Sequence, residues 1–235
     1  MQVFLSGVGI TMLYIAIAAI IVMSARAILT IPDELFRKIL HFVLLGAYIP
    51  LVFAFDAWWM ATALALGMIV LFFPLLALLE RIPHFSTFVN ERKGGEFKSS
   101  MVLAIGMMAF STAVCWGWLE DRYLVLASVY AWGVGDAFAA LIGKRFGKHK
   151  IRWKYADSHK SVEGSSAMLI ASFLSVLTVL LIRGGLPFGA CVLIALPCAV
   201  VCTVAELCAK NGRDTVICPL CAMAVILPLT AIWGG

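Results

Sequence analysis

The chain has 235 residues, of which 63% are hydrophobic and only 13% are charged. Soluble domains contain roughly 45–50% apolar and about 25% charged residues. The composition therefore excludes a soluble globular domain, a disordered chain, a collagen-like chain and a small secreted disulfide scaffold. The formal net charge is +5, and its meaning depends on where the 18 Lys and Arg residues lie relative to the apolar segments.

Eight apolar runs are long enough to cross a membrane. A transmembrane helix needs about 20 mainly apolar residues. Runs of about this length predict spans at Val3–Met23, Ile39–Phe55, Ala57–Leu79, Ser99–Leu119, Tyr123–Gly143, Gly164–Ile182, Pro187–Ala209 and Thr215–Trp233. We therefore predict an all-α fold, a polytopic transmembrane helical bundle of about eight spans. No loop is long enough to fold alone, so residues 1–235 are expected to form a single membrane-embedded domain.

Lys and Arg residues are concentrated in alternate loops. The loops after the first, third, fifth and seventh runs contain 16 of the 18, and the remaining loops contain two. Because positive residues favour the cytoplasmic side, the first set of loops is predicted to be cytoplasmic. An even number of spans then places both termini on the non-cytoplasmic side. The second of these loops, residues 80–98, fits a mobile lid and a solvated linker equally well.

Asp136 is an acidic residue inside the predicted span Tyr123–Gly143. An ionisable side chain within a span costs about 2.5–3.5 kcal/mol on insertion scales, so its presence points to a function. Gly and Ala residues flank Asp136 and allow neighbouring helices to approach closely. The carboxylate could hold a cation that faces the cytoplasm, or it could be a structural partner of a nearby Arg or Lys.

Three further carboxylates are expected at the same cytoplasmic level. Glu163 precedes the sixth span, Glu206 lies near the end of the seventh, and Asp214 follows it across a short turn. Magnesium prefers a few carboxylates together with phosphate oxygens and water. Two or three ligands from Asp136, Glu163, Glu206 and Asp214 would therefore suffice for a metal site. For Glu206 and Asp214, an interfacial ion-pair network is the alternative.

The loop between the fifth and sixth spans is strongly basic, with seven Lys and Arg residues in 144–163. Such a loop suits a triphosphate, and it also suits lipid headgroups with Trp153 and Tyr155 at the membrane interface. At its end, the first N–H groups and the dipole of the next helix favour an anion. The candidate phosphate-binding residues of this region are Lys144, Lys148, Lys160, Ser161, Gly164 and Ser165.

A second group of candidates precedes the second span. If this segment is helical, Arg37, Lys38 and His41 share one face with Glu34. Arg37 and Lys38 suit phosphate binding, and His41 could orient a nucleophile or accept a proton. The alternative is that the two basic residues anchor the helix at the membrane surface and His41 is a packed core residue.

Together these motifs resemble the integral-membrane family of CTP-dependent lipid kinases that includes dolichol kinase, phytol kinase and yeast-type diacylglycerol kinase, which is related to phosphatidate cytidylyltransferases. The residues that carry the resemblance are Glu34-x-x-Arg37-Lys38-x-x-His41, Gly135-Asp136-Ala137-x-Ala139-x-x-x-Gly143-x-x-x-Gly147-Lys148, Lys160-Ser161-x-Glu163-Gly164-Ser165, and Glu206 with Asn211-Gly212-x-Asp214 and Pro219. The last motif departs from the family pattern Gly-x-Asp-Asn, because Thr215 follows Asp214.

The resemblance implies transfer of a phosphoryl group from CTP to the hydroxyl of a membrane lipid alcohol, such as a polyprenol or dolichol, a phytol-like isoprenoid or diacylglycerol. It implies Mg²⁺ as the divalent cation and an active site that faces the cytoplasm, in a bacterial inner membrane or the endoplasmic reticulum. The expected partners are a nucleoside triphosphate, the lipid alcohol and the bilayer, with no nucleic acid, and a homodimer is one possible assembly. The expected catalytic residues are Asp136, His41, Lys160 and Glu163.

Other classes of function remain open. In nucleotidyl transfer, phosphatidate would attack the α-phosphate of CTP and pyrophosphate would leave. A transporter or channel would use Asp136 and Glu206 as proton or cation sites, and a lipid-binding scaffold would bind no nucleotide. The gathering of polar residues on one face favours an enzyme that is supplied from the cytoplasm.

Overall fold

The computed structural model describes residues 1–81, 96–154, 160–209 and 212–234. Within these ranges the regular structure is helical, apart from one isolated β-bridge between Lys150 and Ser161. Eight helices of the described chain are long and apolar enough to cross a membrane. The prediction of an all-α fold with about eight spans is therefore confirmed. Most of the second loop predicted to be cytoplasmic, residues 82–95, lies outside the described residues, as do Lys210 and Asn211.

The chain forms two compact units, Met1–Gly117 and Trp118–Gly235. The first unit contains α1 (Gln2–Ile28), α2 (Asp33–Phe53), α3 (Trp58–Leu79) and α5 (Glu96–Ser111), and the π-helix η1 (Thr112–Trp118) continues α5 to the boundary. The second unit contains α6 (Arg122–Phe146), α7 (Val162–Arg183), α8 (Phe188–Cys208) and α9 (Asp214–Gly234).

In the first unit, two helices extend beyond the apolar runs that predicted them. Helix α1 continues to Ile28, and α2 begins at Asp33 rather than at Ile39. Polar contacts explain the extension: the Arg26 guanidinium lies 2.7 Å from the Asp33 carboxylate and stacks on the Phe36 ring. Two acidic residues in the first turn of α2 also suit the helix dipole. The predicted helical segment before the second span is thus confirmed.

Within the first unit, α1 packs on α2 and α3 packs on α5. Close approach of α1 and α2 depends on Gly46, because a Cβ at this position would lie 2.0 Å from the Tyr14 hydroxyl. That hydroxyl donates a 3.0 Å hydrogen bond to the Val43 carbonyl. Near the end of α3, Glu80 forms a 2.6 Å ion pair with Lys98 of α5.

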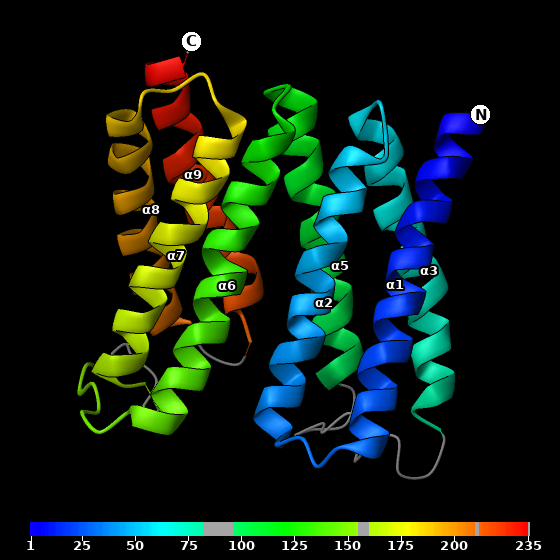
Figure 1. Ribbon diagram of the computed structural model, residues 1–235, viewed down its shortest axis with the longest axis horizontal. Helices are drawn as coiled ribbons and strands as arrows, with labels where there is room; N and C mark the ends of the chain where they lie inside the picture. Colours follow the sequence, from blue (N-terminus) through cyan, green and yellow to red (C-terminus); the bar gives the residue numbers. More distant parts are fainter. Residues whose placement is uncertain (82–95, 155–159, 210–211, 235) are drawn as a thin grey trace. The chain divides into compact units, whose positions relative to one another are not determined.

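The second unit is a bundle of four helices in which each helix packs on two neighbours, α6 on α7, α7 on α8, α8 on α9 and α9 on α6 (Figure 1). Helix α6 is the most buried of the four candidate spans in this unit. The connection from α6 to α7 and the connection from α8 to α9 lie at the same end of the bundle, which is the lower end in Figure 1. Polar residues from both connections are therefore brought to one end.

Glycine residues allow α6 and α7 to pack closely. A Cβ on Gly164 would lie 2.9 Å from the Ala139 carbonyl oxygen and 3.2 Å from the Gly143 Cα. Further along the same pair, the Ser172 hydroxyl donates a 2.5 Å hydrogen bond to the Ala131 carbonyl. Small residues and a side-chain hydrogen bond are the usual means of packing transmembrane helices, where lipid supplies no hydrophobic drive.

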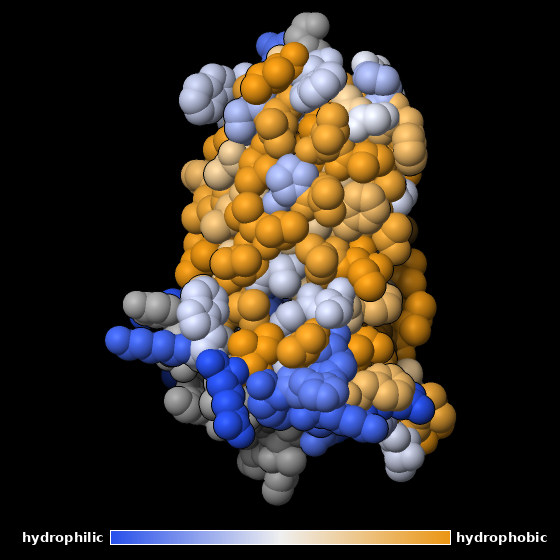
Figure 2. All heavy atoms as spheres, turned by 90° about the vertical axis from the view of Figure 1, so that its left-hand side faces the viewer, coloured by the Kyte–Doolittle hydropathy of each residue, from blue (hydrophilic) through white to orange (hydrophobic). Residues whose placement is uncertain are grey.

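The outer surface of the second unit is apolar over most of its length. Figure 2 shows this face from the left-hand side of Figure 1, with hydrophilic residues gathered mainly at the lower end. Exposed large apolar side chains cover α7 and α8, among them Ile170, Leu174, Leu181, Leu193, Leu196 and Val200. This is the surface expected of helices that face lipid.

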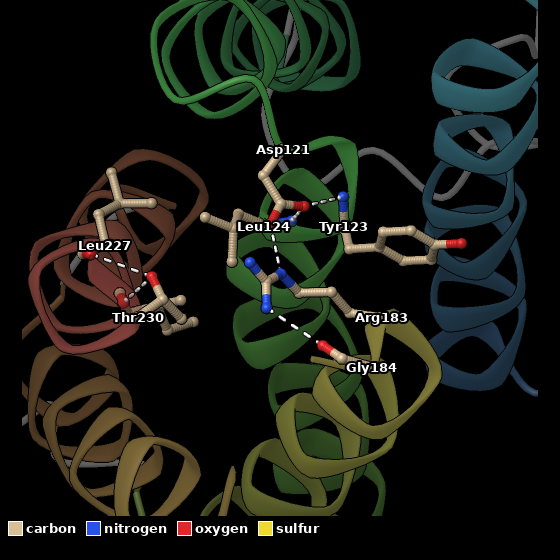
Figure 3. Close-up of polar contacts among 8 residues, drawn as sticks. Asp121, Tyr123, Leu124, Arg183, Gly184, Leu227 and Thr230 are labelled. Atoms are coloured by element: carbon tan, nitrogen blue, oxygen red, sulfur yellow. Dashed lines mark hydrogen bonds and ion pairs between the residues drawn. The ribbon is translucent and has the colours of Figure 1, made fainter. Parts of the chain in front are cut away.

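At the other end of the second unit, Asp121 joins the start of α6 to the end of α7 (Figure 3). Its carboxylate accepts hydrogen bonds from the N–H groups of Tyr123 and Leu124 at 2.9 and 3.4 Å, and so caps α6. The same carboxylate pairs with the Arg183 guanidinium, which also donates to the Gly184 carbonyl. Arg183 is one of the two basic residues outside the predicted cytoplasmic loops, and Asp121 neutralises its charge.

The contact between α6 and α7 predicts that Gly164→Val destabilises the protein. The new side chain would be forced against backbone atoms of α6, and overpacking of this kind typically costs about 1–3 kcal/mol. The matched control is Gly189→Val in α8, because a Cβ on Gly189 meets no atom within 4 Å. Thermal unfolding of the purified protein in detergent should show a lower midpoint for Gly164→Val than for the control. Equal midpoints would contradict the packing argument.

Asp121 allows the cap and the ion pair to be separated. Asp121→Asn keeps an oxygen that can cap α6 but removes the charge opposite Arg183, whereas Asp121→Ala removes both. Loss of an N-cap costs about 0.5–2 kcal/mol, so Asp121→Ala should lower the unfolding midpoint more than Asp121→Asn. If the two variants unfold at the same temperature, the ion pair rather than the cap carries the stabilisation.

Candidate functional site

The candidate site lies in the second unit, at the end where α6 and α8 finish and α7 and α9 begin (Figure 1). Asp136 comes from α6, Lys160 from the residues before α7, Glu206 from α8 and Asp214 from the first turn of α9. Because the four helices pack in a ring, these four polar residues meet although 78 positions separate the first from the last. The predicted common level of Asp136, Glu206 and Asp214 is consistent with this arrangement.

A buried ion pair between Lys160 and Glu206 is the central contact of the site. Glu206 is only 2% exposed, whereas the Lys160 side chain keeps 28% of its surface exposed. The ammonium binds one carboxylate oxygen, Oε1, and the second oxygen, Oε2, is buried without a hydrogen-bond partner among the described residues. A buried acceptor without a donor is costly, so this atom marks the place where a further cation or donor would be stabilised.

Asp136 and Asp214 complete the cluster. Both carboxylates are close enough to act on the charge of the Lys160 ammonium. Asp214 also accepts a 3.3 Å hydrogen bond from the indole Nε1 of Trp132, which lies one helical turn before Asp136 on α6. Trp132 is itself buried, so the indole holds the start of α9 against α6. We refer to Asp136, Lys160, Glu206 and Asp214 as the polar cluster.

The electrostatics of the polar cluster keep Lys160 charged. Burial by itself would lower the pKa of the ammonium, but the charge and hydrogen bond of Glu206, aided by Asp136 and Asp214, raise the pKa above its ordinary value. The cluster therefore contains a cation that is paired with Glu206 and stabilised by two further carboxylates.

Glu163 has a different partner. Its carboxylate lies 2.7 Å from His149 Nδ1 and accepts a hydrogen bond from the His149 backbone N–H. Backbone hydrogen bonds from Ile151 to Lys160 and from Val162 to His149 close the basic loop beside this contact. Glu163 thus fastens the two ends of the loop together. Its predicted role as a metal ligand or catalytic residue stays a prediction.

The first amides of α7 are already used within the protein. Ser161 is buried, and its hydroxyl caps the helix by accepting a 3.2 Å hydrogen bond from the Gly164 N–H. The Ser165 N–H donates to the Ser161 carbonyl, and the Val162 N–H donates to His149. The expectation of free N–H groups here is wrong for these three amides, because the cap and the loop satisfy them. Phosphate binding at this point would have to rely on side chains.

Lys144 and Lys148 are exposed at and just after the end of α6. Between the two lysines lies Gly147, where a Cβ would clash with the Gly143 carbonyl and would lie 2.6 Å from the Ser161 hydroxyl. This close approach keeps the base of the loop against the start of α7. The exposed lysines are therefore attached to the same end of the bundle as the polar cluster.

Three predicted site residues belong to the first unit. Arg37, Lys38 and His41 all lie on α2, where Lys38 is buried and Arg37 forms a 3.4 Å ion pair with Glu34. Their shared helix face is confirmed by the helical bounds of α2. A part for them in phosphate binding or proton transfer stays a prediction.

The donors of the polar cluster are compatible with a divalent metal, although they do not form a closed metal cage. Among the described residues, no three His, Cys, Asp or Glu side chains converge closely enough to hold a metal ion. Magnesium bound with a nucleotide usually takes only one or two carboxylates and completes its shell with phosphate and water. The unsatisfied Oε2 of Glu206 provides one such oxygen.

Two residues of this end were not assigned by the sequence reasoning. Trp132 holds Asp214, and His149 holds Glu163. The position of Trp132 four residues before Asp136, on the same helix face, was an available signal. No comparable signal links His149 to Glu163, since their contact depends on how the basic loop closes.

One curated protein shows a local similarity to this chain. Dolichol kinase sec59 of Schizosaccharomyces pombe is 46% identical over 50 residues, which is 21% of this chain. The match spans only 9% of the length of that kinase. No family model matches the chain, and no solved structure matches it.

Proposed function

We propose that the protein is an integral-membrane kinase that transfers the γ-phosphoryl group of CTP to the hydroxyl of a membrane lipid alcohol. The acceptor class comprises polyprenols or dolichol, phytol-like isoprenoids and diacylglycerol. The observation that carries the proposal is the polar cluster, in which Lys160 and three carboxylates meet beside a basic loop at one end of an apolar bundle. The local similarity to a dolichol kinase supports it.

The proposed reaction requires little covalent chemistry from the protein. The lipid hydroxyl oxygen forms a bond to the γ-phosphorus. The bond between the γ-phosphorus and the oxygen that bridges it to the β-phosphate breaks, and CDP leaves with this bridging oxygen. The hydroxyl proton is released to a base or to solvent. Positioning and electrostatic stabilisation dominate catalysis of such transfers, and these are the contributions that a preorganised cluster of charges can supply.

Within the second unit, Asp136 with Glu206 or Asp214 would hold Mg²⁺, and Glu163 is a further candidate ligand. The bound metal would neutralise charge on the phosphates. Lys160 reaches the same place from the start of α7, and exposed Lys144 and Lys148 would attract the triphosphate to this end of the bundle. Ser161, Gly164 and Ser165 would shape the base of the phosphate site, because their backbone sets the position of Lys160.

Arg37 and Lys38 are proposed to neutralise charge on the phosphates, and His41 to orient the acceptor hydroxyl. These proposals rest on the helical face that the three residues share in the first unit. The membrane is proposed to be a bacterial inner membrane or the endoplasmic reticulum, with the polar cluster on the cytoplasmic side and both termini on the opposite side.

Nucleotidyl transfer is the competing function, since the same charges would suit attack by phosphatidate on the α-phosphate of CTP. The two reactions deliver different phosphorus atoms to the lipid. Purified protein should be given CTP labelled at either the α or the γ phosphorus, with polyprenol, phytol, farnesol, diacylglycerol or phosphatidate in mixed micelles. We expect lipid labelling from the γ position only. Labelling from the α position only would identify a cytidylyltransferase, and no labelling from either would favour a transporter or scaffold.

Asp136→Asn should lower the rate of phosphoryl transfer by on the order of a hundredfold or more, because the removed charge would hold the metal. Asp121→Asn is the matched control, since it makes the same change at the opposite end of the same helix. The measurement is the initial rate of γ-label transfer at equal amounts of folded protein. A similar loss in both variants would show that the effect is one of stability rather than of the site.

A further inference from the structure

The Lys160 side chain occupies a position that a divalent cation would otherwise favour. Its ammonium binds Glu206 directly and is acted on by Asp136 and Asp214. Carboxylates from three different helices thus act on one organic cation, and Glu206 is the one in direct contact with it. The ammonium satisfies a single oxygen of Glu206 and leaves Oε2 buried without a partner among the described residues.

We propose that Lys160 is a tethered cation that stands in for the divalent metal of the polar cluster and is exchanged for it when metal and nucleotide bind together. This inference rests on the proposed function, because the nucleotide phosphates provide the new partner for the displaced ammonium. It assigns Lys160 a role beyond phosphate binding, namely control over when the carboxylates accept a metal.

The size of the two cations supports the exchange. An ammonium sits about 2.7–2.9 Å from a carboxylate oxygen, whereas Mg²⁺ sits about 2.0–2.1 Å from its oxygens and requires octahedral geometry. Carboxylates arranged around an ammonium are therefore too far apart to enclose the smaller ion. In the described part of the chain no three acidic side chains converge closely enough to hold a metal ion, which agrees with a site that an ammonium occupies. Departure of Lys160 would let the carboxylates close on a metal.

The position of Lys160 in the fold makes the exchange feasible. The residue precedes α7 and lies at the end of the basic loop, with 28% of its side chain exposed. Glu206, in contrast, is fixed within α8 and is almost fully buried. The lysine can therefore swing toward phosphates outside the cluster while the backbone of α8 keeps Glu206 at the site. Its backbone is held meanwhile, because the Lys160 carbonyl accepts a hydrogen bond from Ile151.

Exchange couples the metal to the nucleotide. Without nucleotide, a metal must expel the ammonium from Glu206 and leave it without a partner. With nucleotide, the phosphates take the ammonium as the carboxylates take the metal. The affinity of each ligand should then rise when the other is bound, by the same factor in both directions.

The test uses Mn²⁺, whose unbound form is counted by its electron paramagnetic resonance signal, on the full-length protein in detergent without nucleotide. Lys160→Met removes the ammonium, and the matched control Lys148→Met removes an exposed charge from the same loop. We expect Lys160→Met to bind Mn²⁺ on the order of tenfold more tightly than the unsubstituted protein, and Lys148→Met to match the unsubstituted protein. Adding Glu206→Gln to Lys160→Met should reverse the gain. Equal Mn²⁺ affinity in folded Lys160→Met and unsubstituted protein would overturn the proposal.

A second measurement needs no substitution, and so remains decisive if Lys160→Met does not fold. Reductive methylation of lysines, followed by mass spectrometry, reports how accessible each amine is. The first condition combines saturating Mn²⁺ with a CTP analogue that carries a methylene between the β and γ phosphorus. Under this condition Lys160 should be modified at a different rate from that measured without ligands. Mn²⁺ alone at saturation should speed modification of Lys160 because the ammonium leaves Glu206, and Lys150 on the exposed loop serves as the internal control. An unchanged rate at Lys160 under saturating Mn²⁺ would overturn the proposal.

These readouts separate the inference from the proposed function. Tighter Mn²⁺ binding by Lys160→Met supports the tethered cation whether or not the protein phosphorylates any of the lipids tested. Transfer of γ-label by the unsubstituted protein together with unchanged Mn²⁺ binding in Lys160→Met would overturn the inference and leave the kinase function intact.

Discussion

The buried carboxylate of Glu206 is the constraint on which this end of the second unit depends. An ionised group removed from water is expensive unless a partner neutralises it, and Lys160 supplies that partner from a point 46 residues earlier in the chain. The pair fixes the start of α7 against the end of α8. Backbone hydrogen bonds from Ile151 to Lys160 and from Val162 to His149 keep the described positive residues of the basic loop at this end of the unit.

The close packing of α6 and α7 provides the second requirement. Gly164 lies against the backbone of α6 at Ala139 and Gly143, with no room for a side chain. This contact brings the start of α7 next to the turn of α6 that follows Asp136, so the lysine and the aspartate interact. The Trp132 hydrogen bond to Asp214 adds α9 to the same arrangement. A site composed of single residues from three helices and from the segment before α7 thus depends on contacts made by residues with no chemical role of their own.

The two ends of the second unit use charge differently. At one end, Asp121 caps α6 and pairs with Arg183, and its oxygens are engaged by partners close in space, so the contact is a structural brace (Figure 3). At the other end, one cation serves several carboxylates and a buried Glu206 oxygen has no partner in the described part of the protein. A saturated ion pair resists change, whereas an excess of acidic groups over basic ones is suited to binding a further cation.

The sequence by itself determined the all-α membrane architecture, because span length and the alternation of basic loops are properties of local composition. It also identified Asp136 and Glu206 as unusual, since charge is costly in apolar segments, and Lys160 as part of a strongly basic loop. The apolar run of the second span began only at Ile39, whereas α2 begins at Asp33, because polar contacts of Arg26 extend the helices beyond the apolar runs. Only the tertiary structure decided that Lys160 pairs with Glu206 while Glu163 pairs with His149. Such pairings depend on helix packing and loop closure between residues far apart in the chain, which no local pattern records.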